Sequence, residues 1–135
     1  MFSTALTLSD LMLLAKGAGM TLAVTFFAVT GGTLMGLAFG VIRAQISPWA
    51  ALPLTFVLDV FRSVPLLFQL VIANAFQAIA GLNMPPFTTS CIVLALYTSA
   101  YCTEIVRGAI DAVPMVTRRA ARSLGLTWGQ DMTYI

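Results

Sequence analysis

The run from Gly17 to Ile42 contains no charged side chain over 26 residues, and it constrains the fold more than any other feature. As an α-helix rising about 1.5 Å per residue, this run is longer than a hydrocarbon core of roughly 30 Å. The 135-residue chain is 59% hydrophobic and 9% charged, whereas soluble domains carry roughly 25% charged residues. A chain of this size cannot hide so much apolar surface from water, so we predict an all-α integral membrane protein.

A second uncharged stretch, residues 63–103, is long enough for two crossings of the membrane. The sequence GLNMPP at 81–86 indicates a tight reversal that divides it. Pro65, near the start of the stretch, is expected to kink or begin a helix because it cannot donate a backbone hydrogen bond. The chain therefore predicts three transmembrane helices, at about 17–42, 54–80 and 87–107, with 43–53 as a connection.

Residues 1–16 are mixed in character and precede the first span. Ser9 is a candidate N-cap for a short helix. Leu11 and Leu14 give that helix an apolar face, which favours a position in the membrane interface rather than across the membrane. We expect 1–16 to be a separate interfacial segment, and 17–135 to form one transmembrane unit.

Gly32, Gly36 and Gly40 fall four residues apart and so lie on one side of the first span. Glycines allow another helix to approach closely, and close packing is what associates helices in lipid. Two interpretations stay open, packing within one subunit and a contact between subunits.

Polar side chains also occur within the expected second and third spans, namely Gln69, Asn74, Gln77, Tyr97, Tyr101 and Glu104. An amide in lipid needs a hydrogen-bond partner, so the three amides are expected to face the protein interior. Tyr97, Tyr101 and Glu104 share one helical face. These residues could form hydrogen bonds between helices and an ion network of Glu104 with Arg107 and Asp111, or they could line a polar route for a solute.

Basic residues distribute unequally about the three expected spans. Six fall on one side, and Lys16 falls on the other; the six are Arg43, Arg62, Arg107, Arg118, Arg119 and Arg122. An excess of arginine marks the cytoplasmic side of a membrane protein. The arginines are therefore predicted to be cytoplasmic and the N-terminus extracytoplasmic.

Several functional classes are disfavoured by composition. The chain has no histidine, so the commonest metal ligand and general base is missing, and we expect neither a metal site nor a cofactor. No zinc-protease or nucleophile-elbow motif is present, which argues against an enzyme. A net charge of +2 gives no indication of nucleic-acid binding.

The segment 112–135 follows the third span and contains three arginines close together, Arg118, Arg119 and Arg122. After Pro114, Val116, Ala120 and Leu124 recur at helical spacing, and Gly125 suits the end of a helix. Physical chemistry alone allows such an element to lie on anionic lipid or to fill a groove in a partner protein.

This segment resembles the EAA loop of bacterial ABC importer permeases. The pattern of that loop is Glu-Ala-Ala, three residues, Gly, nine residues and Ile-x-Leu-Pro, and the matching residues are Ala120, Ala121, Gly125 and Ile135. The sequences TLAVT (21–25), FRSVPLLFQL (61–70) and EIVRGAIDAVP (104–114) resemble the polar amino acid permease family in particular. The resemblance extends over 17–135.

The resemblance implies the N-terminal part of a type I permease in the bacterial inner membrane, importing an amino acid. It implies a separate ATP-binding subunit that performs hydrolysis, a second permease subunit, identical or different, and an extracytoplasmic amino-acid-binding protein. The residues it assigns to coupling with the ATPase are Arg119, Ala120, Ala121, Gly125 and Ile135.

The resemblance has departures. Arg119 stands where the pattern has glutamate, and Val116-Thr117 stand where Gly-Gln is usual. Arg119 implies either a partner with a compensating acidic residue or the less coupled half of an asymmetric pair. About two further spans are expected after the Leu-Pro that would follow Ile135. The alternatives are a truncated or accessory membrane fragment without transport activity, and a carrier coupled to an ion gradient.

Overall fold

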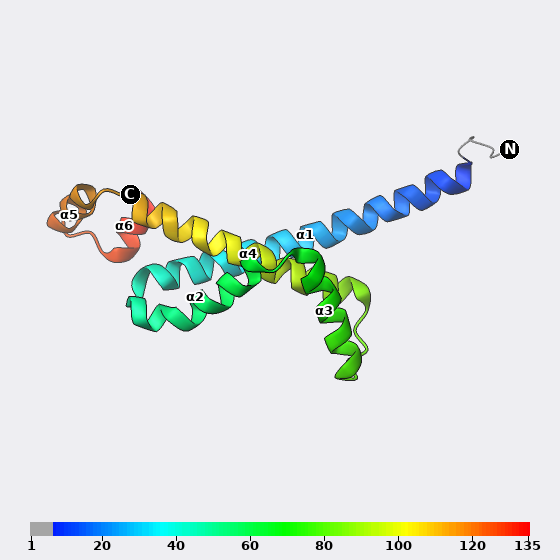
Figure 1. Ribbon diagram of the computed structural model, residues 1–135. Coiled ribbons are helices and arrows are strands. Elements are labelled where there is room, and N and C mark those ends of the chain that lie inside the picture. The colour runs from blue at the N-terminus through cyan, green and yellow to red at the C-terminus, as the bar shows by residue number, and fades with distance from the viewer. Residues whose placement is uncertain (1–6) are drawn as a thin grey trace.

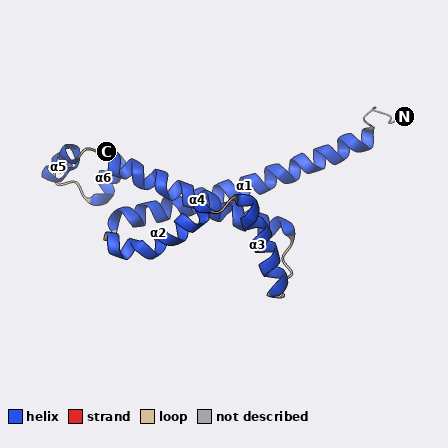
Figure 2. Ribbon diagram, viewed as in Figure 1, coloured by secondary structure: helices blue, strands red, loops and turns tan. Residues whose placement is uncertain are grey.

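The computed structural model describes residues 7–135, and every regular element in that part of the chain is a helix (Figures 1 and 2). The helices are α1 (Leu8–Gln45), α2 (Pro48–Ser63), α3 (Leu66–Ile79), α4 (Pro86–Ala112), α5 (Met115–Ser123) and α6 (Trp128–Tyr134). Two of them, α1 and α4, are long and apolar enough to cross a membrane, and α2 with α3 qualifies as a third crossing if taken as one bent span.

Helix α1 begins well before the predicted first span. Its N-cap is Thr7, which forms a capping box with Asp10. Ser9 was expected as the cap, but it lies inside the helix, because Thr7 has the acidic partner three residues later. Residues 8–16 are therefore continuous with the spanning helix rather than a separate interfacial helix, and the rest of the predicted segment, 1–6, lies outside the described residues.

Helices α1 and α4 pack along most of the length of α4 and form the centre of the fold (Figure 1). Gly32, Gly36 and Gly40 face α4 and are among the most buried residues of α1. A Cβ added to Gly32 would lie 2.6 Å from the Ala95 carbonyl oxygen, and one added to Gly40 would lie 2.6 Å from the Val106 Cβ. The glycines thus allow α1 and α4 to pack closely within this subunit, which is the first of the two interpretations that the sequence left open.

The register of this contact fixes the direction of the two helices. Gly32 meets Thr98, Gly36 meets Cys102 and Gly40 meets Val106. Each step of four along α1 is a step of four in the same sense along α4, so the helices are parallel. The chain between two parallel neighbours has to return across the layer, and α2 and α3 provide that return.

The predicted second span, 54–80, is not one continuous helix. Helices α2 and α3 meet at 106° (Figure 1). Pro65 causes the break, because its ring disfavours helical geometry at Val64, which is extended with φ −91° and ψ 127°. A kink or helix start at Pro65 was predicted correctly, and α2 with α3 corresponds to the predicted second span if the two are taken as one bent crossing.

The predicted connection at 43–53 is also shorter than expected. Only Ile46 and Ser47 separate α1 from α2, and Ser47 caps α2 by accepting a hydrogen bond from the Ala50 amide at 3.4 Å. Proline suits the first position of a helix. Pro48, which lies in the expected connection, therefore begins α2.

Two short helices follow α4, of which only the first, with Gly125 at its end, was predicted from the sequence. The turn after α5 is a Schellman motif: the Leu126 amide donates to the Ala121 oxygen at 3.1 Å and the Gly125 amide donates to the Arg122 oxygen at 3.0 Å. Gly125 has φ +75°, which explains why glycine is needed there. The capping box of Thr127 and Gln130 then starts α6.

Candidate functional site

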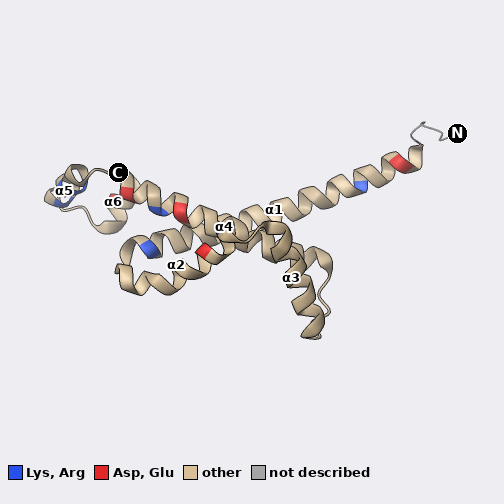
Figure 3. Ribbon diagram, viewed as in Figure 1, with Lys and Arg blue, Asp and Glu red and all other residues tan. Residues whose placement is uncertain are grey.

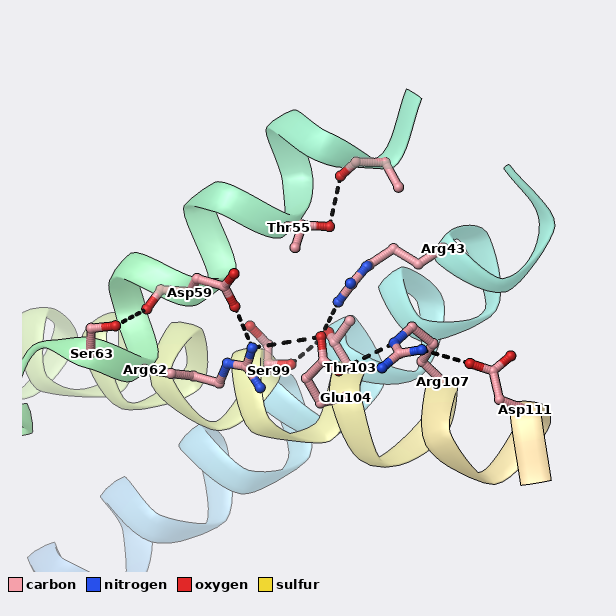
Figure 4. A network of polar contacts seen from close by, with 11 residues as sticks. Arg43, Thr55, Asp59, Arg62, Ser63, Ser99, Thr103, Glu104, Arg107 and Asp111 are labelled. Carbon is pink, nitrogen blue, oxygen red and sulfur yellow. Dashed lines mark hydrogen bonds and ion pairs between the residues drawn. The ribbon is translucent and has the colours of Figure 1, made fainter. Parts of the chain in front are cut away.

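A cluster of charged side chains joins α1, α2 and α4 (Figure 4). Its centre is Glu104 on α4, whose carboxylate accepts hydrogen bonds from Arg43 on α1 and from Arg107 on α4, the latter with Nη2 at 3.1 Å from Oε2. Arg62 on α2 lies 3.7 Å from the same carboxylate. One carboxylate therefore ties α1, α2 and α4 together, and we call Glu104, Arg43, Arg62 and Arg107 the charge cluster.

Two further carboxylates complete the cluster at its edges. Asp59 pairs with Arg62 within α2, and Asp111 accepts from Arg107 Nη1 at 2.6 Å within α4. Three arginines thus meet three carboxylates, which neutralises charge that would otherwise be costly in an apolar setting. The Arg43 side chain is only 9% exposed, so it depends on Glu104 more than the others do. The predicted Asp111–Arg107–Glu104 network is confirmed.

Gln69 was a candidate for lining a solute route, and the structure gives it a different contact. Its amide nitrogen donates to the carbonyl oxygens of Phe61 at 2.6 Å and Val64 at 2.7 Å. These carbonyls belong to the end of α2, where the break at Pro65 leaves them without helical donors. Gln69 therefore supports the bend between α2 and α3.

Gln77 and Asn74 belong to a second polar chain. The Thr89 hydroxyl on α4 donates to Gln77 Oε1 at 2.8 Å, and Gln77 donates to Asn74 Oδ1 at 3.1 Å. Asn74 donates in turn to the Leu70 oxygen of its own helix at 2.8 Å. Gln77 thus links α3 to α4, which agrees with a hydrogen bond between helices, while Asn74 remains exposed.

Tyr97 and Tyr101 lie on the face of α4 that continues to Glu104. Their hydroxyls are 3.2 Å apart and their rings 4.9 Å apart. Next to α4, in the elbow between α2 and α3, lies a cavity of about 390 Å³ with an apolar lining that includes Phe61, Phe76 and Leu96. Gln69 also lines it, but the tyrosines and Glu104 do not. The predicted polar residues are therefore divided between separate places.

The segment beyond α4 places the other candidates on α5 and α6. Ala121 is buried, whereas Arg119, Ala120, Gly125 and Ile135 are exposed. Arg118 turns back and donates to the Ile110 carbonyl oxygen at the end of α4, which holds α5 against the spanning helix. Figure 3 shows that the charged residues gather at this end of the molecule, apart from Asp10 and Lys16 near the start of α1.

Sequence reasoning missed two of these roles. Arg43 and Arg118 were counted only as basic residues that set orientation, although each makes a specific contact across elements. Neither contact follows from spacing, because the partners are 61 and 8 residues away. The one signal was that Arg43 ends an uncharged run, which makes an unpaired arginine there costly.

Comparison with known proteins agrees with the resemblance found in the sequence. The family described as "Binding-protein-dependent transport system inner membrane component" matches residues 28–135. The "Probable amino-acid ABC transporter permease protein y4tG" of Sinorhizobium fredii (strain NBRC 101917 / NGR234) is 31% identical over 131 residues, which are 97% of this chain and 57% of that protein.

Two more similarities agree with this. The "Glutamine transport system permease protein GlnP" of Escherichia coli (strain K12) is 30% identical over 126 residues, covering 91% of this chain and 57% of that protein. A solved structure, the "Crystal structure of an amino acid ABC transporter with histidines", is 35% identical, has a TM-score of 0.74, and covers 96% of this chain and 63% of that one. The chain therefore spans somewhat more than half the length of these relatives.

Proposed function

Because the chain belongs to the family of binding-protein-dependent transport system inner membrane components, we propose that it forms part of the permease subunit of an ATP-driven amino acid importer. The main support for the proposal is the arrangement of the C-terminal ends of α1 and α4 relative to α5. The parallel helices α1 and α4 finish close together, and the chain then presents an exposed basic helix, α5, beyond them (Figure 1).

The proposed orientation places α5 in the cytoplasm and the N-terminus outside. Arg43, Arg62 and Arg107 meet at Glu104 on α4, the helix that α5 follows, whereas Lys16 lies near the start of α1. This distribution has the asymmetry that sets the orientation of membrane proteins.

The proposed partner of α5 is a separate ATP-binding subunit, in which hydrolysis takes place. Arg119, Ala120, Gly125 and Ile135 are exposed and available to that partner, whereas Ala121 is buried. A second permease subunit and an extracytoplasmic amino-acid-binding protein complete the proposed importer.

Within the membrane, we place the solute route along the Tyr97–Tyr101 face of α4, with Glu104 at its cytoplasmic end. Both tyrosines keep part of their side chains accessible, and Tyr101 is 41% exposed. Asn74 is exposed on α3, although its amide already donates to the Leu70 oxygen and accepts from Gln77. The amide nitrogen of Gln69 and the amide oxygen of Gln77 already hold helix contacts, so these two groups have little freedom to bind a solute.

The test is uptake of labelled amino acids into proteoliposomes that contain the native permease with its ATP-binding subunit and binding protein. We expect uptake that requires ATP inside the vesicle and stops when the ATP-binding subunit is omitted. Uptake driven by an ion gradient alone, without ATP, would contradict the proposal.

A further inference from the structure

Helix α5 presents two different exposed faces. Val116, Ala120 and Leu124 follow one another at four-residue intervals, and Val116 and Leu124 are 78% and 81% exposed. The arginines lie on another side of the helix, around Met115. A third side carries Ala121, which is buried. The helix is thus tied to the end of α4 through Arg118, while its apolar face stays exposed within the described part of the chain.

The basic face surrounds a hollow of about 320 Å³, which is lined by Met115, Arg118, Arg119 and Arg122. No aspartate or glutamate occurs between residues 112 and 130. The arginines of the charge cluster meet three carboxylates, Glu104 with Asp59 and Asp111, whereas the hollow brings three arginines together with none. Arg118 is held by the Ile110 carbonyl oxygen, so Arg119 and Arg122 are the two that remain available.

The position of α5 favours a protein partner over a lipid surface. Figure 1 shows α5 beyond the end of α4, farther along that helix than the turn from α1 to α2. Trp49, 83% exposed at the start of α2, suits the level of the lipid headgroups. A helix beyond that level, with a basic face and a separate apolar face, fits a groove with two walls.

We propose that Arg119 and Arg122 bind acidic side chains that line a groove in the ATP-binding subunit, while Val116 and Leu124 pack against an apolar wall of the same groove. This inference rests on the proposed function, since that function supplies the partner. It adds the chemistry of the partner surface: carboxylates lie opposite Arg119, which stands where the EAA pattern has glutamate. Complementary charge fixes which ATP-binding subunit this permease accepts.

The experiment measures the affinity of the native permease complex, held in nanodiscs, for its purified ATP-binding subunit. Arg119→Glu and Arg122→Glu should each weaken binding by about tenfold or more, because repulsion replaces attraction at the interface. The weakening should shrink at high salt, where exposed charges are screened. Lys16→Glu makes the same change of charge on α1, far from α5, and should leave the affinity unchanged.

Replacing a groove carboxylate of the ATP-binding subunit with lysine should restore the binding of Arg119→Glu. Unchanged affinity in both arginine variants would overturn the inference. It would also be overturned if the variants lost binding to vesicles of anionic phospholipid while keeping the ATP-binding subunit, since lipid would then be the partner. If ATP-driven uptake persists while the inference fails, the proposed function stands; if native protein shows no ATP-driven uptake, that function fails.

Discussion

The α1–α4 contact and helix α5 differ in whether their charged and apolar side chains find partners in the described part of the chain. Along α1–α4, three glycines admit a neighbouring backbone, and at its end a single carboxylate, Glu104, joins arginines from three helices. On α5, arginines gather without carboxylates and large apolar side chains stay exposed. The arginines around Glu104 find carboxylates within the described part of the chain, whereas we propose that the opposite charge and apolar surface facing α5 come from a partner.

We therefore expect the α1–α4 contact to determine the stability of the protein and the exposed faces of α5 to determine recognition of a partner. Substitutions in the α1–α4 contact should act on folding, because backbone and buried charge have no alternative partners there. Substitutions on the exposed faces of α5 should leave folding nearly unchanged and act on assembly. Four substitutions that sharpen this division follow, in decreasing order of expected effect on the free energy of unfolding.

Gly36→Leu should destabilise the protein most, by about 4 kcal/mol. Even a Cβ at this position would lie 2.9 Å from the Ser99 carbonyl oxygen and would collide with Cys102, so the backbone of α4 would have to move. Thermal unfolding in detergent measures the effect. Gly19→Leu is the matched control, because nothing lies within 4 Å of a Cβ there; equal losses in the two variants would refute the packing role of Gly36.

Glu104→Gln should cost about 3 kcal/mol, since it leaves the largely buried Arg43 without its carboxylate. Chemical denaturation in detergent gives the difference in free energy of unfolding. Asp111→Asn removes an exposed carboxylate from the edge of the same cluster and should cost less than about 1 kcal/mol. Similar costs for the two variants would mean that Glu104 is not the centre of the cluster.

Gln69→Leu should cost about 2 kcal/mol, because the carbonyl oxygens of Phe61 and Val64 both lose a donor at the bend. Amide hydrogen exchange should show faster opening at the end of α2 than in the native protein. Gln45→Leu is the control, as Gln45 donates only to the Val41 oxygen of its own exposed helix turn. Faster exchange spread evenly along α1 and α4 would argue against a local role for Gln69.

Gly125→Ala should have the smallest effect on stability, about 1 kcal/mol, because a residue with a Cβ resists the φ of +75° required after α5. The loss should be confined to the turn and α6, and it should weaken binding of the ATP-binding subunit by misplacing α5. Hydrogen exchange at Leu126 and Gly125 reports the turn directly. A drop in the unfolding temperature as large as that of Gly36→Leu would remove the distinction between the two regions.

Much of this could be predicted from the sequence, because lipid imposes simple requirements. The all-helical membrane fold and the resemblance to polar amino acid permeases are confirmed. The glycine repeat predicted a close contact and Gly125 predicted the end of α5, since each depends on local geometry. Arg119 in place of glutamate was visible in the sequence, and the structure adds its exposure beside Met115 and Arg122.

The remainder depends on contacts that no local pattern encodes. Arg43 meets Glu104 across two helices, and Gln69 turns to the carbonyl oxygens of a preceding helix instead of to a solute. The break at Pro65 was anticipated, but not its 106° angle, which depends on how α3 packs against α4. Capping at Thr7 rather than Ser9 was decided by which residue had an acid three positions later.

The most direct test of the account is cross-linking from α5 in native membranes. Val116→benzoylphenylalanine places a photoreactive group on the exposed apolar face of α5, and Phe68→benzoylphenylalanine places one on α3 as a control, at a residue that is 62% exposed. The account predicts that the α5 variant captures the ATP-binding subunit, identified by mass spectrometry, and that the α3 variant does not. Capture of lipid alone from position 116, in membranes where ATP-driven uptake proceeds, would contradict it.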